Sequence, residues 1–182
     1  MMRRFVPSLL RDTRAAAAAE MALILPMAFA LIFTTMEGGY YFQTEHKAVK
    51  YVREGARFAA RQNFAYFDCS GAGGLQAGGT GMVPLADVQD AIREVTVYGR
   101  PLAANETAPS PRIANWEPGD VNITVTCDAG YATGLYAGTD DLKAPVVLVS
   151  TRFDYTSILG LLGFDVSDFD VVAQAQAAVA GL

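Results

Sequence analysis

The stretch AAAAAEMALILPMAFALIFTTM, residues 15–36, decides how this chain of 182 residues is organised. As a helix rising about 1.5 Å per residue, it covers the roughly 30 Å of hydrocarbon in a bilayer. Four arginines precede it, and a single carboxylate, Glu20, lies within it. Because a carboxylate in lipid is costly, a residue of this kind usually has a function. The run therefore predicts a transmembrane helix, in which Glu20 needs an explanation.

The run has three competing interpretations. A cleaved secretory signal has an apolar core of about 7–15 residues followed by a small-residue cleavage site. Here the run is longer, contains Glu20, and is followed by EGGYY (37–41), which is a poor cleavage site. A plain membrane anchor explains the length and the flanking arginines but leaves Glu20 without a reason.

The third interpretation is a pilin-type N-terminus. A peptidase would cut on the cytoplasmic side, between Ala15 and Ala16, so that Glu20 becomes the fifth residue of the mature chain. Its carboxylate would then pair with the new N-terminal ammonium of a neighbouring subunit, since a charge in a low-dielectric medium needs a partner. On the residues alone, the plain anchor and the pilin-type N-terminus both remain open.

Charge sets the expected orientation. Residues 1–14 carry a net charge of +3, whereas residues 37–182 carry −7, and the whole chain carries −5. The positive-inside rule places the N-terminus in the cytoplasm and the long C-terminal part outside it. An acidic exported part without a basic stripe argues against binding nucleic acid.

The two cysteines, Cys69 and Cys127, both lie in the exported part. An oxidising compartment favours a disulfide between them, which would close a loop of almost 60 residues and contribute about 4 kcal/mol in the chain-entropy model. Two buried free thiols are the alternative. A zinc site is not expected, because His46 is the only histidine and the chain has no CxxC pair.

Beyond the membrane run the helical pattern continues. Gly38 and Gly39 mark the outer interface and are a candidate site for a bend, and the aromatic residues 40–42 are candidate interface anchors. Apolar residues then recur at three- and four-residue steps opposite a charged face, which predicts an amphipathic helix over 37–62. If unbroken from residue 15 to residue 62, the spine would be roughly 70 Å long. We therefore expect a basic leader (1–14), a transmembrane helix (15–36), its amphipathic extension (37–62) and an exported head (63–182).

The head shows an α+β pattern. Glycines indicate a loop over 63–84, a helical period follows over 85–97, and Pro, Ala and Asn indicate another loop over 100–119. Strands are predicted over 121–126 and 146–155, a short helical turn over 158–162, and a closing strand over 169–179. The expected fold class is α+β and pilin-like, with a long N-terminal spine helix laid across a small antiparallel sheet.

Few residues are candidates for catalysis or for binding a metal. The chain lacks the motif contexts of common catalytic and phosphate-binding sites, so we expect a protein that is not an enzyme and needs no cofactor. His46 is interpreted as a surface residue. The acids Asp165, Asp168 and Asp170, with Asp140 and Asp141, contain the oxygen ligands of a calcium site, but solvated turn carboxylates are the favoured interpretation and no metal is predicted.

The run AAAAAEMALILPMAFALIF (15–33), followed by AVKYVREGARFAARQ (48–62), resembles the TadE family of pseudopilins, which belong to tight-adherence (Flp-type) pilus systems. The similarity covers about residues 14–62. Its features are a basic leader, small residues ending in Glu20, and the motif residues Pro26, Glu37, Gly38, Arg53, Glu54, Gly55, Ala56 and Arg57.

The resemblance implies a minor pseudopilin in the bacterial inner membrane, with a single pass and its head outside the cytoplasm. A dedicated prepilin peptidase would process Ala15–Ala16, although Ala15 stands where family members often have Gly. Implied partners are other pilins and pseudopilins, the inner-membrane assembly platform and membrane lipid. Assembly would proceed by helix–helix packing, with Glu20 as the residue that sets register. The alternative function is a membrane-anchored exported binding module with no role in a pilus.

Overall fold

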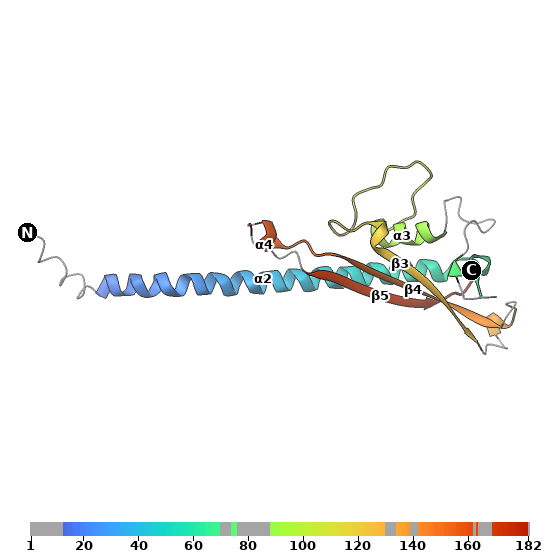
Figure 1. The fold of residues 1–182 in the computed structure, drawn as a ribbon, viewed down its shortest axis with the longest axis horizontal. Helices are drawn as coiled ribbons and strands as arrows, with labels where there is room; N and C mark the ends of the chain where they lie inside the picture. The colour runs from blue at the N-terminus through green and yellow to red at the C-terminus, as the bar shows by residue number, and fades with distance from the viewer. Residues whose placement is uncertain are drawn as a thin grey trace, which may run out of the picture.

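The structure is a computed structural model, and it describes residues 13–69, 74–75, 88–129, 134–138, 142–161, 163 and 169–181. In chain order its elements are α2 (Thr13–Ala60), the 3-10 turn η1 (Phe64–Tyr66), β1 (Phe67–Asp68), β2 (Gly74–Leu75), α3 (Val88–Tyr98), the 3-10 turn η2 (Pro118–Asp120), β3 (Val121–Ala129), the 3-10 turn η3 (Gly134–Gly138), β4 (Lys143–Asp154), α4 (Ile158–Leu161) and β5 (Asp170–Ala178). Figure 1 shows a long helix whose second half lies against the remaining elements, while its first half projects alone.

The spine helix α2 is a single element of 48 residues, about 72 Å long. It continues through Pro26 and through Gly38 and Gly39, so the glycine pair does not end it. It begins at Thr13, two residues before the predicted start, and ends at Ala60. The expected long N-terminal helix is confirmed.

The main sheet has three antiparallel strands in the order β3-β4-β5. Val125 pairs with Val147, and Val149 pairs with Ala175, which fixes the register. Burial alternates along β3, because its odd-numbered apolar residues face the core and its even-numbered polar residues face solvent. The three predicted strands are confirmed, with β3 and β4 starting or ending a few residues beyond the expected limits. Strands β1 and β2 form a separate two-stranded antiparallel sheet.

The core lies between the second half of α2, the main sheet and α3. Ala48, Val52 and Ala59 of α2 are completely buried in it. β5 runs alongside α2 (Figure 1), and its small inward residues Ala173, Ala175 and Ala177 allow the helix to come close. The sheet is thus covered on one face by the protein's own spine, which confirms the α+β class.

The segment between α3 and β3 is irregular, as expected from its composition, but it also contributes to the core. Trp116 is 1% exposed, and its ring stacks on Phe153 at a centroid distance of 5.3 Å. Its indole Nε1 donates a hydrogen bond to the Thr151 hydroxyl (2.9 Å). The sequence signal that could have indicated this contribution is the lone tryptophan of the chain, because large aromatic residues are seldom left in solvent.

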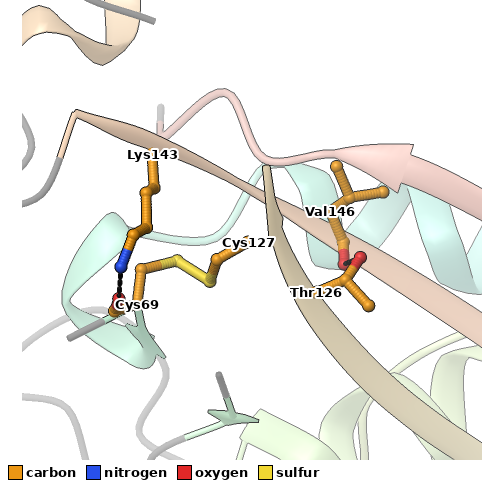
Figure 2. The surroundings of a disulfide bond; sticks show 5 residues. All are labelled: Cys69, Thr126, Cys127, Lys143 and Val146. Carbon is orange, nitrogen blue, oxygen red and sulfur yellow. Dashed lines mark hydrogen bonds between the residues drawn. A yellow bond between two sulfur atoms is a disulfide. The ribbon is translucent and has the colours of Figure 1, made fainter. Parts of the chain in front are cut away.

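The predicted disulfide is confirmed. Cys69, which follows β1, is bonded to Cys127 in β3, with a Cα–Cα distance of 5.7 Å. Figure 2 shows Lys143 of β4 beside this bond, where its ammonium donates a hydrogen bond to the main-chain oxygen of Cys69 (2.9 Å). The bond therefore ties the segment after the spine helix to the far end of the sheet, and the alternative of two free thiols is excluded.

Candidate assembly surface

The projecting half of α2 is an exposed apolar surface. Within residues 15–36, every large apolar side chain from Met21 to Met36 is exposed, from 42% for Phe33 to 75% for Leu23. In the described part of the chain, α2 is the one helix long and apolar enough to cross a membrane. Because none of the segments that the structure describes covers this surface, it fits a membrane anchor whose side chains meet lipid or other helices.

Glu20 lies on the first turns of this surface, with its side chain exposed. It has no hydrogen bond or ion pair within the described ranges. Six residues later, Pro26 lacks an N–H and leaves the carbonyl of Ala22 without its helical partner. Two unsatisfied acceptors therefore lie within about one turn of each other on the apolar half of the helix. In a bilayer, groups of this kind are satisfied by neighbouring helices.

The predicted processing bond, Ala15–Ala16, lies inside α2 close to its N-terminal end. Ala16 is exposed. Helix ends fray by one or two residues, so a bond at this position is accessible to a peptidase in a way that a mid-helix bond is not. Whether cleavage takes place stays a prediction.

Glu37 marks the point where the exposed half of α2 meets the head. Its Oε2 accepts a hydrogen bond from the main-chain N–H of Leu159 in α4 (3.0 Å). The Tyr155 hydroxyl donates to the main-chain oxygen of Glu37 (3.4 Å). Its second carboxylate oxygen, Oε1, is buried and accepts no hydrogen bond from the described residues. The family-motif residue Glu37 therefore holds the β4–β5 connection onto the spine.

The electrostatics at Glu37 favour the ionised form. Burial alone raises the pKa of its carboxyl, but the hydroxyls of Ser157 and Tyr155 and the N–H groups of Leu159 and Ile158 together outweigh burial, so the pKa falls below the ordinary value of 4.5. Burial and the nearby Glu37 carboxylate raise the pKa of Tyr155, so this phenol stays protonated and remains a donor. Tyr155 also packs its ring edge against Tyr41 at 5.1 Å. The contact is thus a charged acceptor surrounded by donors and aromatic rings.

The inner residues of the segment Arg53–Arg57 join the spine to the head. Gly55 faces α3, where an added Cβ would overlap the hydroxyl of Thr96. Ala56 is 2% exposed and belongs to the core. Glu54 forms an ion pair with Arg112, whose guanidinium also lies over the Tyr51 ring, 4.5 Å from its centroid. The periodicity of this helix predicts a charged face, but it does not show that Glu54 pairs with a loop residue.

The outer residues of the segment, Arg53 and Arg57, are exposed one turn apart on α2. Unlike Glu54, neither has a hydrogen bond or ion pair within the part of the chain that the structure describes. The predicted motif thus divides into three residues that build the fold and two arginines that the fold does not use.

Of the remaining candidate residues for catalysis or metal binding, the structure describes His46 and Asp170. His46 is exposed on α2, where a surface residue was expected. Asp170 forms an ion pair with Arg152 (3.3 Å). Asp140, Asp141, Asp165 and Asp168 lie outside the described residues, so the calcium hypothesis is not tested there. The described residues contain no group of three or more metal-binding side chains.

Fold and surface together define a class of protein: an α+β protein with one long spine helix, whose exposed apolar first half fits a membrane anchor. A family model described as TadE-like protein matches residues 15–57. This match confirms the TadE-like resemblance of the spine, and it indicates a protein related to Tad pili. No curated protein and no solved structure matches the chain. The matched range covers Glu20, Glu37 and the segment Arg53–Arg57.

Proposed function

We propose that this protein is a minor pseudopilin of a tight-adherence (Flp-type) pilus or secretion system, which acts in pilus assembly through helix–helix packing. The observation that carries the proposal is the projecting half of α2, which presents an uncovered apolar surface with one unpaired carboxylate, Glu20. A simple tether needs the apolar surface but not the acid. The TadE-like match over residues 15–57 supports the same role.

In the proposed mechanism, Glu20 sets the register between neighbouring spines. After cleavage between Ala15 and Ala16, the new N-terminal ammonium of one subunit meets the Glu20 carboxylate of the next. The two groups are four residues apart along a helix, so the pairing requires an axial shift of about 6 Å between neighbours. A partner without a matching cation would leave Glu20 unpaired in a dry environment, which disfavours wrong alignments.

The proposal includes the setting of the protein. It places a single-pass chain in the bacterial inner membrane, with the N-terminus cytoplasmic and the head outside the cytoplasm. Its partners are other pilins or pseudopilins, the inner-membrane assembly platform, the prepilin peptidase and membrane lipid, and not nucleic acid. It acts by assembly and not as an enzyme. The charge asymmetry across the membrane run supports this orientation.

Replacement of Glu20 by alanine tests the proposal in a cell that builds tight-adherence pili with this chain as its only copy. We expect Glu20→Ala to reach the membrane at normal abundance while pilus number falls about tenfold, since a polar contact between helices in a bilayer contributes about 1–2 kcal/mol. Glu20→Asp keeps the charge and is the matched control. Normal pilus numbers in the Glu20→Ala strain would refute the register role.

Mass spectrometry of the purified protein tests processing separately. The expected N-terminus is Ala16. A chain that still contains Arg14 would show that no cut occurs at Ala15, and Glu20 would then have to pair with some other group.

A further inference from the structure

Two open hollows on the head carry opposite charge. The first, the basic groove, has a volume of about 520 Å³ and lies between α2 and β5. Arg53 and Arg57 line one side of it, and Gln174 and Gln176 line the other. The structure describes no acid that neutralises either arginine, although the Glu54 between them is paired with Arg112. The groove therefore offers two free guanidinium groups on an otherwise acidic protein.

The second hollow, the acidic groove, has a volume of about 450 Å³. Among the described residues that line it, the carboxylates are Glu117, Asp120, Asp154 and Asp170, and the one cation is Arg152. Arg152 forms an ion pair with Asp170, and Asp120 accepts the main-chain N–H of Glu117 (2.9 Å). Asp154 has no side-chain partner in the ranges that the structure describes. The groove thus keeps a net negative charge.

The two grooves lie at different heights along the spine. The acidic groove is at the level of Tyr41, whose hydroxyl donates to the main-chain oxygen of Asp170 (3.1 Å). The basic groove is at the level of residues 53–57. Fourteen helical residues separate these levels, which is about 20 Å, and the rise of β5 from Asp170 to Gln176 gives about the same distance. In Figure 1, β5 can be followed along the second half of α2.

We propose that the basic groove of one copy docks against the acidic groove of a second copy, so that two heads meet through unlike surfaces. The complementary charge on one chain is the reason for choosing a second copy as the occupant. Pairing two basic grooves would bring like charges together, which is unfavourable. Because the two surfaces differ, the contact is head-to-tail, and a contact of this kind builds rings or open helical arrays and does not end at a dimer.

The geometry adds a condition. For two spines that run in the same direction, the acidic groove of one copy reaches the basic groove of the other only after an axial shift of about 20 Å. Copies at equal depth in a bilayer do not meet in this way, whereas staggered copies do. This shift is larger than the 6 Å shift for Glu20, so the two contacts join a subunit to different neighbours. The inference rests on the proposed assembly role and names one of its contacts.

Anionic lipid does not explain the free arginines. Arg53 lies 17 residues beyond the end of the membrane run, about 25 Å along α2. The headgroup region adds only about 5–8 Å to each side of the hydrocarbon. The basic groove is therefore beyond the reach of lipid headgroups on a helix that crosses the bilayer upright.

Cross-linking of the full chain in detergent micelles tests the contact. One preparation carries Arg57→Cys and an affinity tag, and the other carries Asp154→Cys without a tag. A short bis-maleimide joins free thiols and leaves the Cys69–Cys127 disulfide intact. We expect the mixed dimer to exceed either homodimer by roughly tenfold. Its yield should fall as salt is raised, because the screening length shortens.

Ala103→Cys, at an exposed position outside both grooves, is the matched control. Cross-linking of either variant with Ala103→Cys, or with itself, at the level of the mixed pair would overturn the proposal. A second arm adds Arg53→Glu to the Arg57→Cys chain, and the mixed yield should drop roughly tenfold and return when the partner carries Glu117→Lys. An unchanged yield with Arg53→Glu would also overturn it. Circular dichroism confirms that each variant is folded.

The result of the cross-linking experiment can be separated from the result of the experiment that tests the proposed function. The cross-link forms in micelles and needs no pilus, whereas the Glu20→Ala experiment counts pili and needs no cross-link. A mixed dimer together with normal pili in Glu20→Ala would keep the head contact and remove the register role. Loss of pili in Glu20→Ala without a mixed dimer would keep the register role and remove the head contact.

Discussion

At the scale of single residues, Gly55 shows how one position connects the spine with the head. α2 and α3 cross at this glycine, and the Thr96 hydroxyl occupies the space that a side chain would need. That hydroxyl is fixed because it donates to the main-chain oxygen of Ile92 (2.7 Å). The absence of a side chain at Gly55 therefore sets how closely the two helices approach.

We expect Gly55→Ala to destabilise the head by about 1–3 kcal/mol, the usual cost of forcing extra volume into a packed core. Urea unfolding in detergent, followed by circular dichroism, measures the effect. Gly38→Ala is the matched control on the same helix, since nothing lies within 4 Å of its added Cβ and alanine favours helix. The explanation fails if Thr96→Ala does not recover part of the loss caused by Gly55→Ala.

At the scale of elements, the docking of α4 depends on one carboxylate of α2. α4 has only four residues, which is too short to be stable alone. It is held by the hydrogen bond between Glu37 Oε2 and the Leu159 N–H and by Tyr155 next to it. The β4–β5 connection is therefore fastened just outside the membrane run.

Because the folded pKa of Glu37 is lower than its ordinary value of 4.5, docking is fully favoured above that pH. It should weaken as the pH falls through the lowered pKa, when the carboxylate becomes protonated. Hydrogen exchange of the Leu159 amide, expressed as a protection factor on both sides of this range, measures the change. We expect a loss of protection of roughly fivefold, for about 1 kcal/mol.

Glu37→Gln keeps an oxygen acceptor but cannot titrate. Protection of Leu159 in this variant should be lower at neutral pH and should no longer depend on pH. Asp90→Asn, at an exposed acid of α3, is the control and should behave as the wild type. The same pH dependence in Glu37→Gln and the wild type would show that another group controls α4.

At the scale of the whole molecule, one helix serves two environments. Its first half is uncovered and apolar, and its second half supplies Ala48, Val52 and Ala59 to the core of the head. Because the helix is continuous between them, a force or a displacement at the membrane end reaches the head directly. A flexible linker between anchor and head would not transmit it.

Replacing residues 16–36 with an unrelated apolar helix separates a pseudopilin from an anchored binding module. We expect the exchanged chain to remain in the membrane with an unchanged melting temperature of the head, because the core begins beyond residue 36. Pilus assembly should be lost, since the specific helix packing and Glu20 are gone. Pili at wild-type numbers would support the anchored binding module instead.

The spine and the three strands could be predicted from the sequence, and the disulfide was favoured there over two free thiols. Each depends on a local signal: the apolar run 15–36, two cysteines in an exported part, and alternation in residues such as Val121–Thr126. The acid at Glu20 was equally visible, because a charge within an apolar run stands out without any structure.

Which residues lie side by side became visible only in the folded structure. The strand order, the Glu54–Arg112 pair, the Gly55–Thr96 crossing and the clamp at Glu37 join residues distant in the chain. Periodicity shows which face of an element is buried, but it does not show against what. Arg53 and Arg57 became significant only once the structure showed that Glu54, which lies between them, is paired with Arg112. Whether a charge is paired depends on its surroundings in the fold, and its position in the sequence does not show them.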